Sequence, residues 1–237
     1  MSTTTSTTPT SSSAPSSRWR RQGGPPLLVP VLAFAVLTVA SATLGASAPR
    51  PDTSAAQVLT YDNGHGTVMT VAAAVLFGST IPLIISAATL YRKLRRLGVA
   101  APGPLMGFAG GMLAAASLAA SALFTWTAAQ TAELADPALA RALTTLSFAT
   151  GATGFVVPFG LLVAGIAVPA LILRLLPRSV AWAGLVIAAL ALLSTFAMLT
   201  TALYPLLPIG RFGGVLFLIA AAALLPSQAH RRPAARP

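Results

Sequence analysis

Six long apolar segments, separated by short polar ones, run along most of the chain. A bilayer core of about 30 Å needs about 20 helical residues, and each apolar segment is close to this length. The segments do not alternate apolar and polar residues as membrane β-strands do. The pattern predicts an all-α, polytopic membrane protein with six transmembrane helices, at residues 27–48, 67–90, 105–128, 143–168, 180–203 and 209–225.

The two ends of the chain differ from this six-helix domain, which covers residues 27–226. Residues 1–26 are rich in Ser, Thr and Pro, so they bury too little apolar surface to offset the entropy of ordering, and we expect a disordered cytoplasmic tail. Residues 227–237 form a second, basic cytoplasmic tail.

A cleaved signal peptide is the alternative for the first apolar segment. Basic residues precede it, and Ala46-Ser47-Ala48 resembles a cleavage site. The apolar run of about 22 residues is longer than the usual 7–15 of a signal peptide. We therefore favour an uncleaved first span.

The basic residues gather in every second loop. Cytoplasmic loops of membrane proteins carry an excess of Lys and Arg, so this asymmetry predicts that both termini are cytoplasmic. The predicted inner side holds Arg18, Arg20, Arg21, Arg92, Lys93, Arg95, Arg96, Arg174, Arg178, Arg231, Arg232 and Arg236, and the outer side holds Arg50, Arg141 and Arg211.

Composition supports lipid as the main surroundings of the chain. Only 8% of the residues are charged and 55% are hydrophobic, with a mean hydropathy of +0.80, whereas soluble domains carry about 25% charged residues. The net charge of +11 is interpreted as a topology signal, which argues against nucleic-acid binding. The preference for Arg over Lys favours a bacterial origin, so we expect the bacterial cytoplasmic membrane.

The outer loops carry the few candidate polar features. We expect a short helix opened by Asp52, a turn at Asn63-Gly64, and a fourth helix that starts at Pro137 with Asp136 as its N-cap. Asp62 and His65 are the only pair that suggests a metal site. Two ligands without a third make a weak site, so we predict no metal and no cofactor.

A candidate polar site lies at mid-membrane depth. Pro82 and Pro158 interrupt two spans, and each frees the carbonyl of a glycine four residues earlier. Nearby hydroxyl groups allow two interpretations. The freed carbonyls line a small polar pocket between the two helices, or they are hydrogen-bonded within their own helices, which are then only kinked. We favour the second interpretation. The candidate residues are Gly78, Ser79, Thr80, Pro82, Thr150, Thr153, Gly154 and Pro158.

The third span carries a stripe of small residues, which lets helix backbones approach closely. The stripe predicts close packing inside the bundle or, less favoured, between two copies of the chain. Its members are Gly107, Gly111, Ala115 and Ala119.

The first five spans contain no ionisable residue, although ion-coupled pumps normally need such groups. No hydrolase, zinc-helix or phosphate-loop motif is present, so we predict no enzymatic activity and no catalytic residues. We expect a structural or accessory component that binds lipids, other membrane proteins or a second copy of itself. The alternative is a transporter or binder of a neutral or lipid-like molecule at the mid-membrane site.

Three segments resemble a group of uncharacterised bacterial six-span proteins described only as a domain of unknown function. They are LYRKLRRLG, ADPALARALTTL and LPRSVAWAGLVIAALALL. In that group the inner loop before the fifth helix often reads Pro-x-Trp-x-Gly-Trp. This chain matches the pattern only in part, at Pro177, Trp182 and Gly184. The resemblance covers about residues 27–226 and implies an integral membrane protein with six spans. It implies no activity and no site residues.

Overall fold

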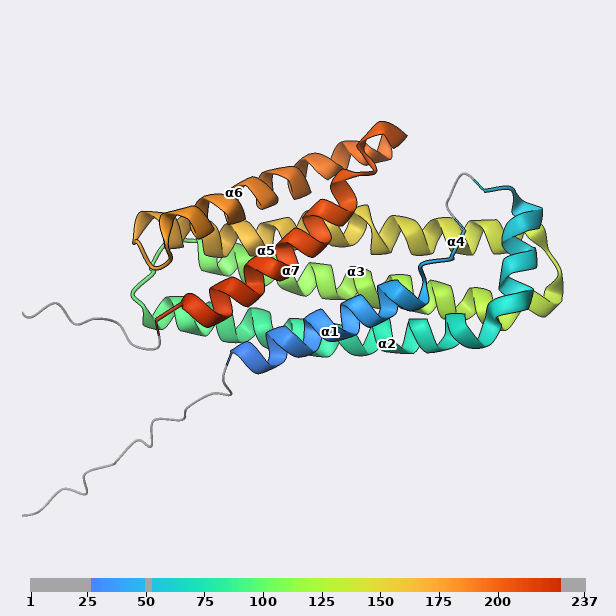
Figure 1. The fold of residues 1–237 in the computed structure, drawn as a ribbon, viewed down its shortest axis with the longest axis horizontal. Coiled ribbons are helices and arrows are strands. Elements are labelled where there is room, and N and C mark those ends of the chain that lie inside the picture. Colours follow the sequence, from blue (N-terminus) through green and yellow to red (C-terminus); the bar gives the residue numbers. More distant parts are fainter. Residues whose placement is uncertain (1–26, 50–52, 227–237) are drawn as a thin grey trace, which may run out of the picture.

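The computed structural model describes residues 27–49 and 53–226, and this part of the chain consists of helices joined by short connections, with no strand (Figure 1). The two predicted tails and Asp52 lie outside the described residues. The elements are α1 (Leu28–Leu44), α2 (Ala55–Arg96), α3 (Gly103–Thr131), η1 (Ala132–Leu134), α4 (Pro137–Gly151), α5 (Thr153–Ile172), α6 (Arg178–Leu193), η2 (Ser194–Met198), η3 (Thr201–Leu203) and α7 (Leu206–Leu224).

Five helical segments in the described chain are long and apolar enough to cross a membrane. They are α2, α3 with η1, α4 with α5, α6 with η2, and η3 with α7. The remaining apolar segment, which is the first in the sequence, forms α1, and this helix is shorter, with 17 residues. The class of an all-helical membrane protein is therefore supported, with five candidate spans.

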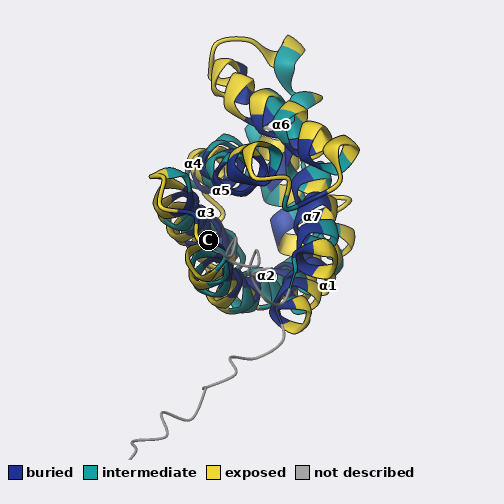
Figure 2. Cartoon of the chain, turned by 90° about the vertical axis from the view of Figure 1, so that its left-hand side faces the viewer, coloured by how far each residue is buried: buried dark blue, intermediate teal, exposed yellow. Residues whose placement is uncertain are grey.

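The helices form a bundle in which α3 packs between α2 and α5. α5 also packs against α6, and α7 contacts α6, α5 and α1. Figure 2, which looks along the bundle, shows the buried residues between the helices and α6 at the outside. The largest fully buried side chains include Phe34, Phe155 and Phe159, and the rings of Phe155 and Phe159 stack with centroids 4.8 Å apart.

The small residues of α3 pack inside the bundle, as the favoured interpretation predicted. A Cβ atom added to Gly107 would lie 3.3 Å from the Cα atom of Gly165 on α5. One added to Gly111 would lie 2.7 Å from the Cβ atom of Ala87 on α2. Ala115 is buried as well, so the stripe sets the distance between α3 and both neighbours.

The second helix differs most from its predicted bounds. α2 has 42 residues and begins at Ala55, where the side chain of Ser54 accepts a hydrogen bond from the Gln57 N–H. The expected turn at Asn63-Gly64 is absent, and both residues are helical. The chain bends instead at His65, which has non-helical angles (φ −126°, ψ 16°). Residues 55–64 consequently lie across one end of the bundle (Figure 1), and we call them the crosswise segment.

The bounds of four other spans also differ from the predicted ones. The first helix ends at Leu44, and Gly45 is its C-cap. The fourth begins at Pro137 with Asp136 as its N-cap, as predicted, but it breaks at Ala152 (φ −94°, ψ −95°) into α4 and α5. The fifth ends at Leu193 and continues as η2 and η3, and the sixth begins at Leu206 instead of residue 209.

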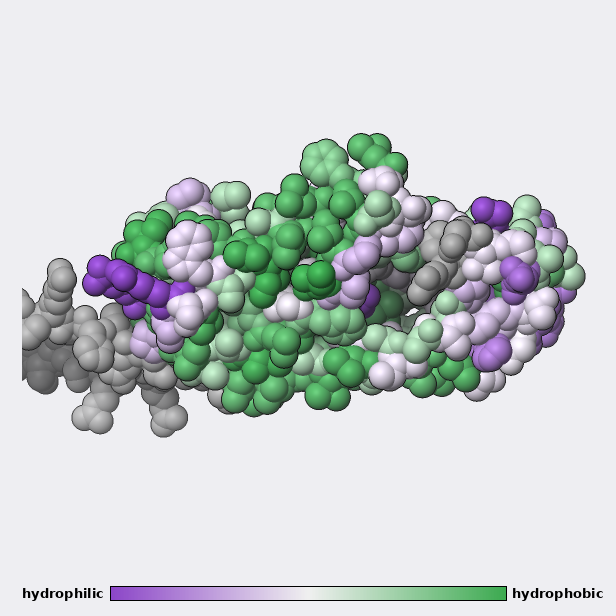
Figure 3. Space-filling view, turned by 45° about the horizontal axis from the view of Figure 1, so that its top comes forward, coloured by the Kyte–Doolittle hydropathy of each residue, from purple (hydrophilic) through white to green (hydrophobic). Residues whose placement is uncertain are grey.

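The surface separates apolar and polar regions along the bundle axis. In Figure 3 the hydrophobic residues cover the middle, and hydrophilic residues gather toward the two ends. The helix bounds place six described basic residues at the end where α2 finishes and α6 begins, and Arg141 and Arg211 toward the other end. The six are Arg92, Lys93, Arg95, Arg96, Arg174 and Arg178.

Candidate functional site

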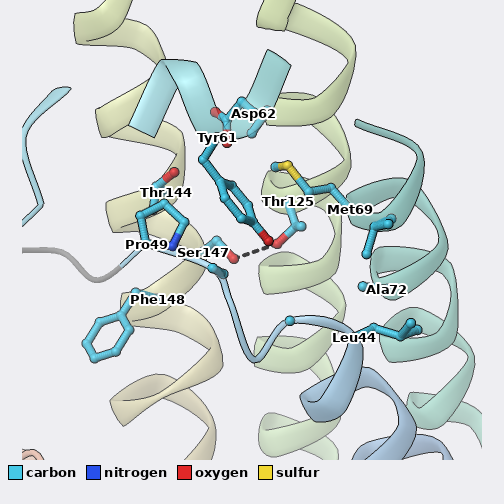
Figure 4. Close-up of a pocket in the computed structure, with 14 residues that line it drawn as sticks. Leu44, Pro49, Tyr61, Asp62, Met69, Ala72, Thr125, Thr144, Ser147 and Phe148 are labelled. Atoms are coloured by element: carbon cyan, nitrogen blue, oxygen red, sulfur yellow. Dashed lines mark hydrogen bonds between the residues drawn. The ribbon is translucent and has the colours of Figure 1, made fainter. Parts of the chain in front are cut away.

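A cavity of about 180 Å³ lies at the end of the bundle covered by the crosswise segment. Four helices, and the chain that follows α1, contribute to its wall (Figure 4). The lining residues are Leu44, Gly45, Ala48, Pro49, Tyr61, Asp62, Val68, Met69, Ala72, Thr125, Ala128, Thr144, Ser147 and Phe148. Most of these side chains are apolar, so the cavity resembles a small-molecule site in composition.

The crosswise segment brings a carboxylate to this cavity. Val58 and Asp62 lie four residues apart, which places them on the same face of the helix, and each is 1% exposed. The Oδ2 atom of Asp62 has no hydrogen-bond partner among the described residues. A buried carboxylate without a partner is costly, and such groups are concentrated at functional sites.

Burial changes the acidity of this group. Asp62 precedes the bend at His65 and therefore lies outside the apolar segment 67–90. Desolvation disfavours the charged form and raises the pKa of Asp62 to about 6, from its ordinary value of 3.8. The carboxyl group is therefore mostly ionised above pH 7 and mostly protonated below pH 5.

A cluster of hydroxyl groups joins α3 to α4 on another wall of the cavity. The hydroxyl groups of Thr125 and Ser147 lie 2.7 Å apart. Ser121 on α3 donates to the Ser147 carbonyl over 2.8 Å, and Thr125 also donates to the Ser121 carbonyl. Because these groups are paired with one another, they hold the two helices together and offer few free ligands.

Tyr61 places an aromatic ring beside Asp62. Its side chain points toward Thr125 and Ser147 in Figure 4, and its hydroxyl group lies 3.1 Å from that of Ser47. The His65 ring stacks on the Tyr61 ring with centroids 4.2 Å apart. His65 Nδ1 lies 3.0 Å from the Tyr61 carbonyl oxygen. No group of three or more potential metal ligands occurs within residues 27–49 and 53–226.

The predicted mid-membrane residues of α2 do not line this cavity. Ser79 and Thr80 are buried, and their hydroxyl groups donate to the carbonyls of Leu76 and Phe77 in the same helix. A Cβ atom on Gly78 would meet no atom within 4 Å. The backbone stays helical through Pro82, and His65 alone has non-helical angles inside α2.

The predicted mid-membrane residues near Pro158 belong to two different helices. Thr150 lies in α4 and donates to the Leu146 carbonyl over 2.7 Å, whereas Thr153, Gly154 and Pro158 lie in α5. α3 packs between α2 and α5, and a Cβ atom on its Gly110 would lie 2.6 Å from the Pro158 carbonyl oxygen. The predicted residues of α2 and α5 therefore fall on opposite sides of α3, and a shared pocket remains a prediction.

Arg211 on α7 is the second charged side chain with an unpartnered buried atom. Its Nε atom has no hydrogen-bond partner among the described residues. Its guanidinium carbon lies 5.1 Å from the centroid of the buried Phe155 ring, within the range of a cation–π contact. The sequence placed Arg211 on the outer side only by its position in the chain, and the structure sets its side chain against Phe155.

Comparison with models of known protein families, with characterised proteins and with solved structures gave no match. From the sequence, Asp62 is expected only as a weak metal ligand. Its four-residue spacing from Val58 would have shown the shared face of a helix, had the segment before residue 67 been recognised as helical.

Proposed function

We propose that the chain crosses the bacterial cytoplasmic membrane six times, with both termini in the cytoplasm. Five candidate spans and the shorter α1 support this number. A helix of 17 residues is about 25 Å long, which is at the lower limit for crossing a bilayer. The six basic residues at one end of the bundle support the orientation, because inner loops are enriched in Lys and Arg.

Reporter fusions test this topology. A fusion after Arg96 or after Arg178 should give a cytoplasmic signal, because each of these residues belongs to the basic end. A fusion at Ala135, which lies between η1 and α4 at the opposite end, should give an external signal. The same signal from Ala135 and Arg96 would contradict the proposal.

We further propose that the protein binds a small organic molecule at the outer face of the membrane, in the cavity beneath the crosswise segment. The observation that carries this proposal is the buried carboxylate of Asp62, which lies without a partner among the described residues in the wall of a mostly apolar cavity. A purely structural bundle gains nothing from this arrangement, since an apolar side chain at position 62 would avoid the cost of burying a charge. The site differs from the mid-membrane site expected from the sequence.

An accessory role, in which the protein binds other membrane proteins, is the second candidate. It is favoured by three large apolar side chains at and just after η2, namely Phe196, Met198 and Leu199, which are more than half exposed. Lipid also covers such side chains in a membrane. Gentle extraction followed by mass spectrometry separates the candidates: a stoichiometric protein partner supports the accessory role, and an enriched small molecule supports the binding role.

Filling the cavity tests the binding role. Ala72 is buried and lines the cavity, so Ala72→Leu should remove most of the small molecule that co-purifies with the protein. Ala74 lies two residues later on an exposed face of the same helix, so Ala74→Leu adds the same volume outside the cavity. Mass spectrometry should find the molecule with the wild type and Ala74→Leu only. An identical set of small molecules in all three proteins would contradict the proposal.

A further inference from the structure

The cavity has a marked imbalance of charge. Of the described residues that line it, Asp62 is the one acid, and none is basic. Its Oδ2 atom is buried and has no hydrogen-bond partner in this part of the chain. A ligand that carries a positive charge would supply the missing partner, since a buried charge is tolerated when it is paired and hydrogen-bonded.

The neighbours of Asp62 suit an organic cation better than a metal ion. Ca²⁺ and Mg²⁺ require several oxygen ligands, but Thr125 and Ser147 already pair with each other. Tyr61 instead provides an aromatic ring in the wall of the cavity, and such rings attract ammonium groups through their π-electrons. The stack with His65 holds this ring in place.

The rest of the cavity is apolar and small. Met69 and Ala72 on α2 face it together with Ala128 on α3 and Phe148 on α4. Met69, Ala72 and Ala128 are each less than 10% exposed. These side chains would surround the hydrocarbon part of a ligand, and the volume of about 180 Å³ limits that part to a single small ring or a short chain.

We propose that the cavity binds a small protonated amine, with its ammonium group against Asp62 and Tyr61 and its hydrocarbon part among Met69, Ala72 and Phe148. This inference rests on the proposed binding function and assigns the class of ligand. Asp62 is the counter-ion of the amine, and the apolar wall selects against strongly hydrated cations such as free metal ions.

Three probes of nearly equal shape and different charge test the assignment. Benzylamine is a cation at pH 8, benzyl alcohol is neutral and benzoate is an anion. Calorimetric titration of the full chain in lipid nanodiscs at pH 8 should show benzylamine binding at least about tenfold more tightly than benzyl alcohol, with no binding of benzoate. Asp62→Asn keeps the shape of the side chain and should remove the preference for benzylamine over benzyl alcohol.

Two further variants separate the possible failures. Ala72→Leu should abolish binding of benzylamine and benzyl alcohol alike, whereas Ala74→Leu should bind as the wild type does. Equal binding of both probes by the wild type, with loss in Ala72→Leu, would overturn the amine assignment and leave the proposed function intact. Absence of binding by every probe to the wild type would overturn the assignment, while a co-purifying molecule that Ala72→Leu loses would still support the binding function.

Arg50 requires its own control because it is the basic residue nearest to Asp62 in the sequence and lies outside the described residues. Arg50→Gln should bind benzylamine with the same affinity as the wild type. Binding of benzylamine by Arg50→Gln alone would overturn the proposal, because Arg50 would then be the natural partner of Asp62.

Discussion

Asp62→Asn is expected to stabilise the ligand-free protein at pH 8. The wild type buries an ionised carboxylate there, because burial raises the pKa of Asp62 to about 6 and the group is fully ionised at pH 8. The difference from the ordinary value of 3.8 sets an upper limit of about 3 kcal/mol on the lost stability, and screening by solvent lowers this figure. Asparagine has no charge to bury but keeps a polar amide, so we expect the free energy of unfolding to rise by about 1–3 kcal/mol.

The pH dependence identifies the cause of this gain. The folded state holds the Asp62 proton more tightly than the unfolded chain, so the wild type loses stability as the pH rises from about 4 to 6. The advantage of Asp62→Asn should therefore shrink by about 1–2 kcal/mol between pH 8 and pH 4. Unfolding in mixed detergent micelles at both pH values measures this.

A matched control removes an acid at the same end of the bundle. Asp136 accepts hydrogen bonds from the N–H groups of Ala138 and Leu139, and asparagine is an equally good N-cap. Asp136→Asn should therefore change stability little at either pH. Destabilisation by Asp62→Asn at pH 8 would show that the carboxylate has a favourable partner in the folded protein.

Gly165→Ala is expected to be the most damaging single-methyl change in the contact between α3 and α5. The added Cβ atom would lie 2.6 Å from both the Gly103 carbonyl oxygen and the Gly107 Cα atom. These are backbone atoms, so relief requires the two helices to separate rather than a side chain to rotate. We expect a loss of about 2–3 kcal/mol in the free energy of unfolding.

Gly78→Ala provides the control, because its Cβ atom meets nothing within 4 Å. Alanine favours the helix over glycine by about 1 kcal/mol, so this variant should be as stable as the wild type or slightly more stable. Both variants are compared by unfolding in the same detergent and by the yield of extracted protein. Equal stability of Gly165→Ala and Gly78→Ala would show that α3 and α5 are not held at backbone contact.

The apolar segments predicted the helical class and most of the bundle because burial in lipid leaves the backbone few other structures. A helix end was predicted correctly where the sequence contains an evident capping residue, as at Asp136-Pro137. Helix ends were missed where the local signals conflicted. Asn63-Gly64 is a typical turn sequence, yet both residues are helical in a segment that buries Val58 and Asp62, and the bend lies at His65.

The candidate cavity could not be predicted because it depends on that bend. The bend turns the crosswise segment across the end of the bundle, so Asp62 lines the cavity together with residues of α3 and α4. A straight second helix would continue along the bundle instead. The mid-membrane hydroxyl groups illustrate the opposite case. Ser79 and Thr80 are polar and buried, but the hydroxyl group of each donates to a carbonyl of its own helix. The spacing of the residues in the sequence does not distinguish such internal hydrogen bonds from a ligand site.

The crosswise segment can also serve as an epitope for an antibody fragment, which would help in imaging a molecule of only 24.0 kDa. Its outward face carries Gln57, Thr60 and Asn63, which are exposed, while Val58 and Asp62 fix its inward face to the bundle. An antibody fragment raised against this folded epitope would add mass and a recognisable outline beyond the detergent belt. The crosswise segment covers the cavity. A change in the affinity of the fragment when the cavity is filled would therefore show that this segment moves.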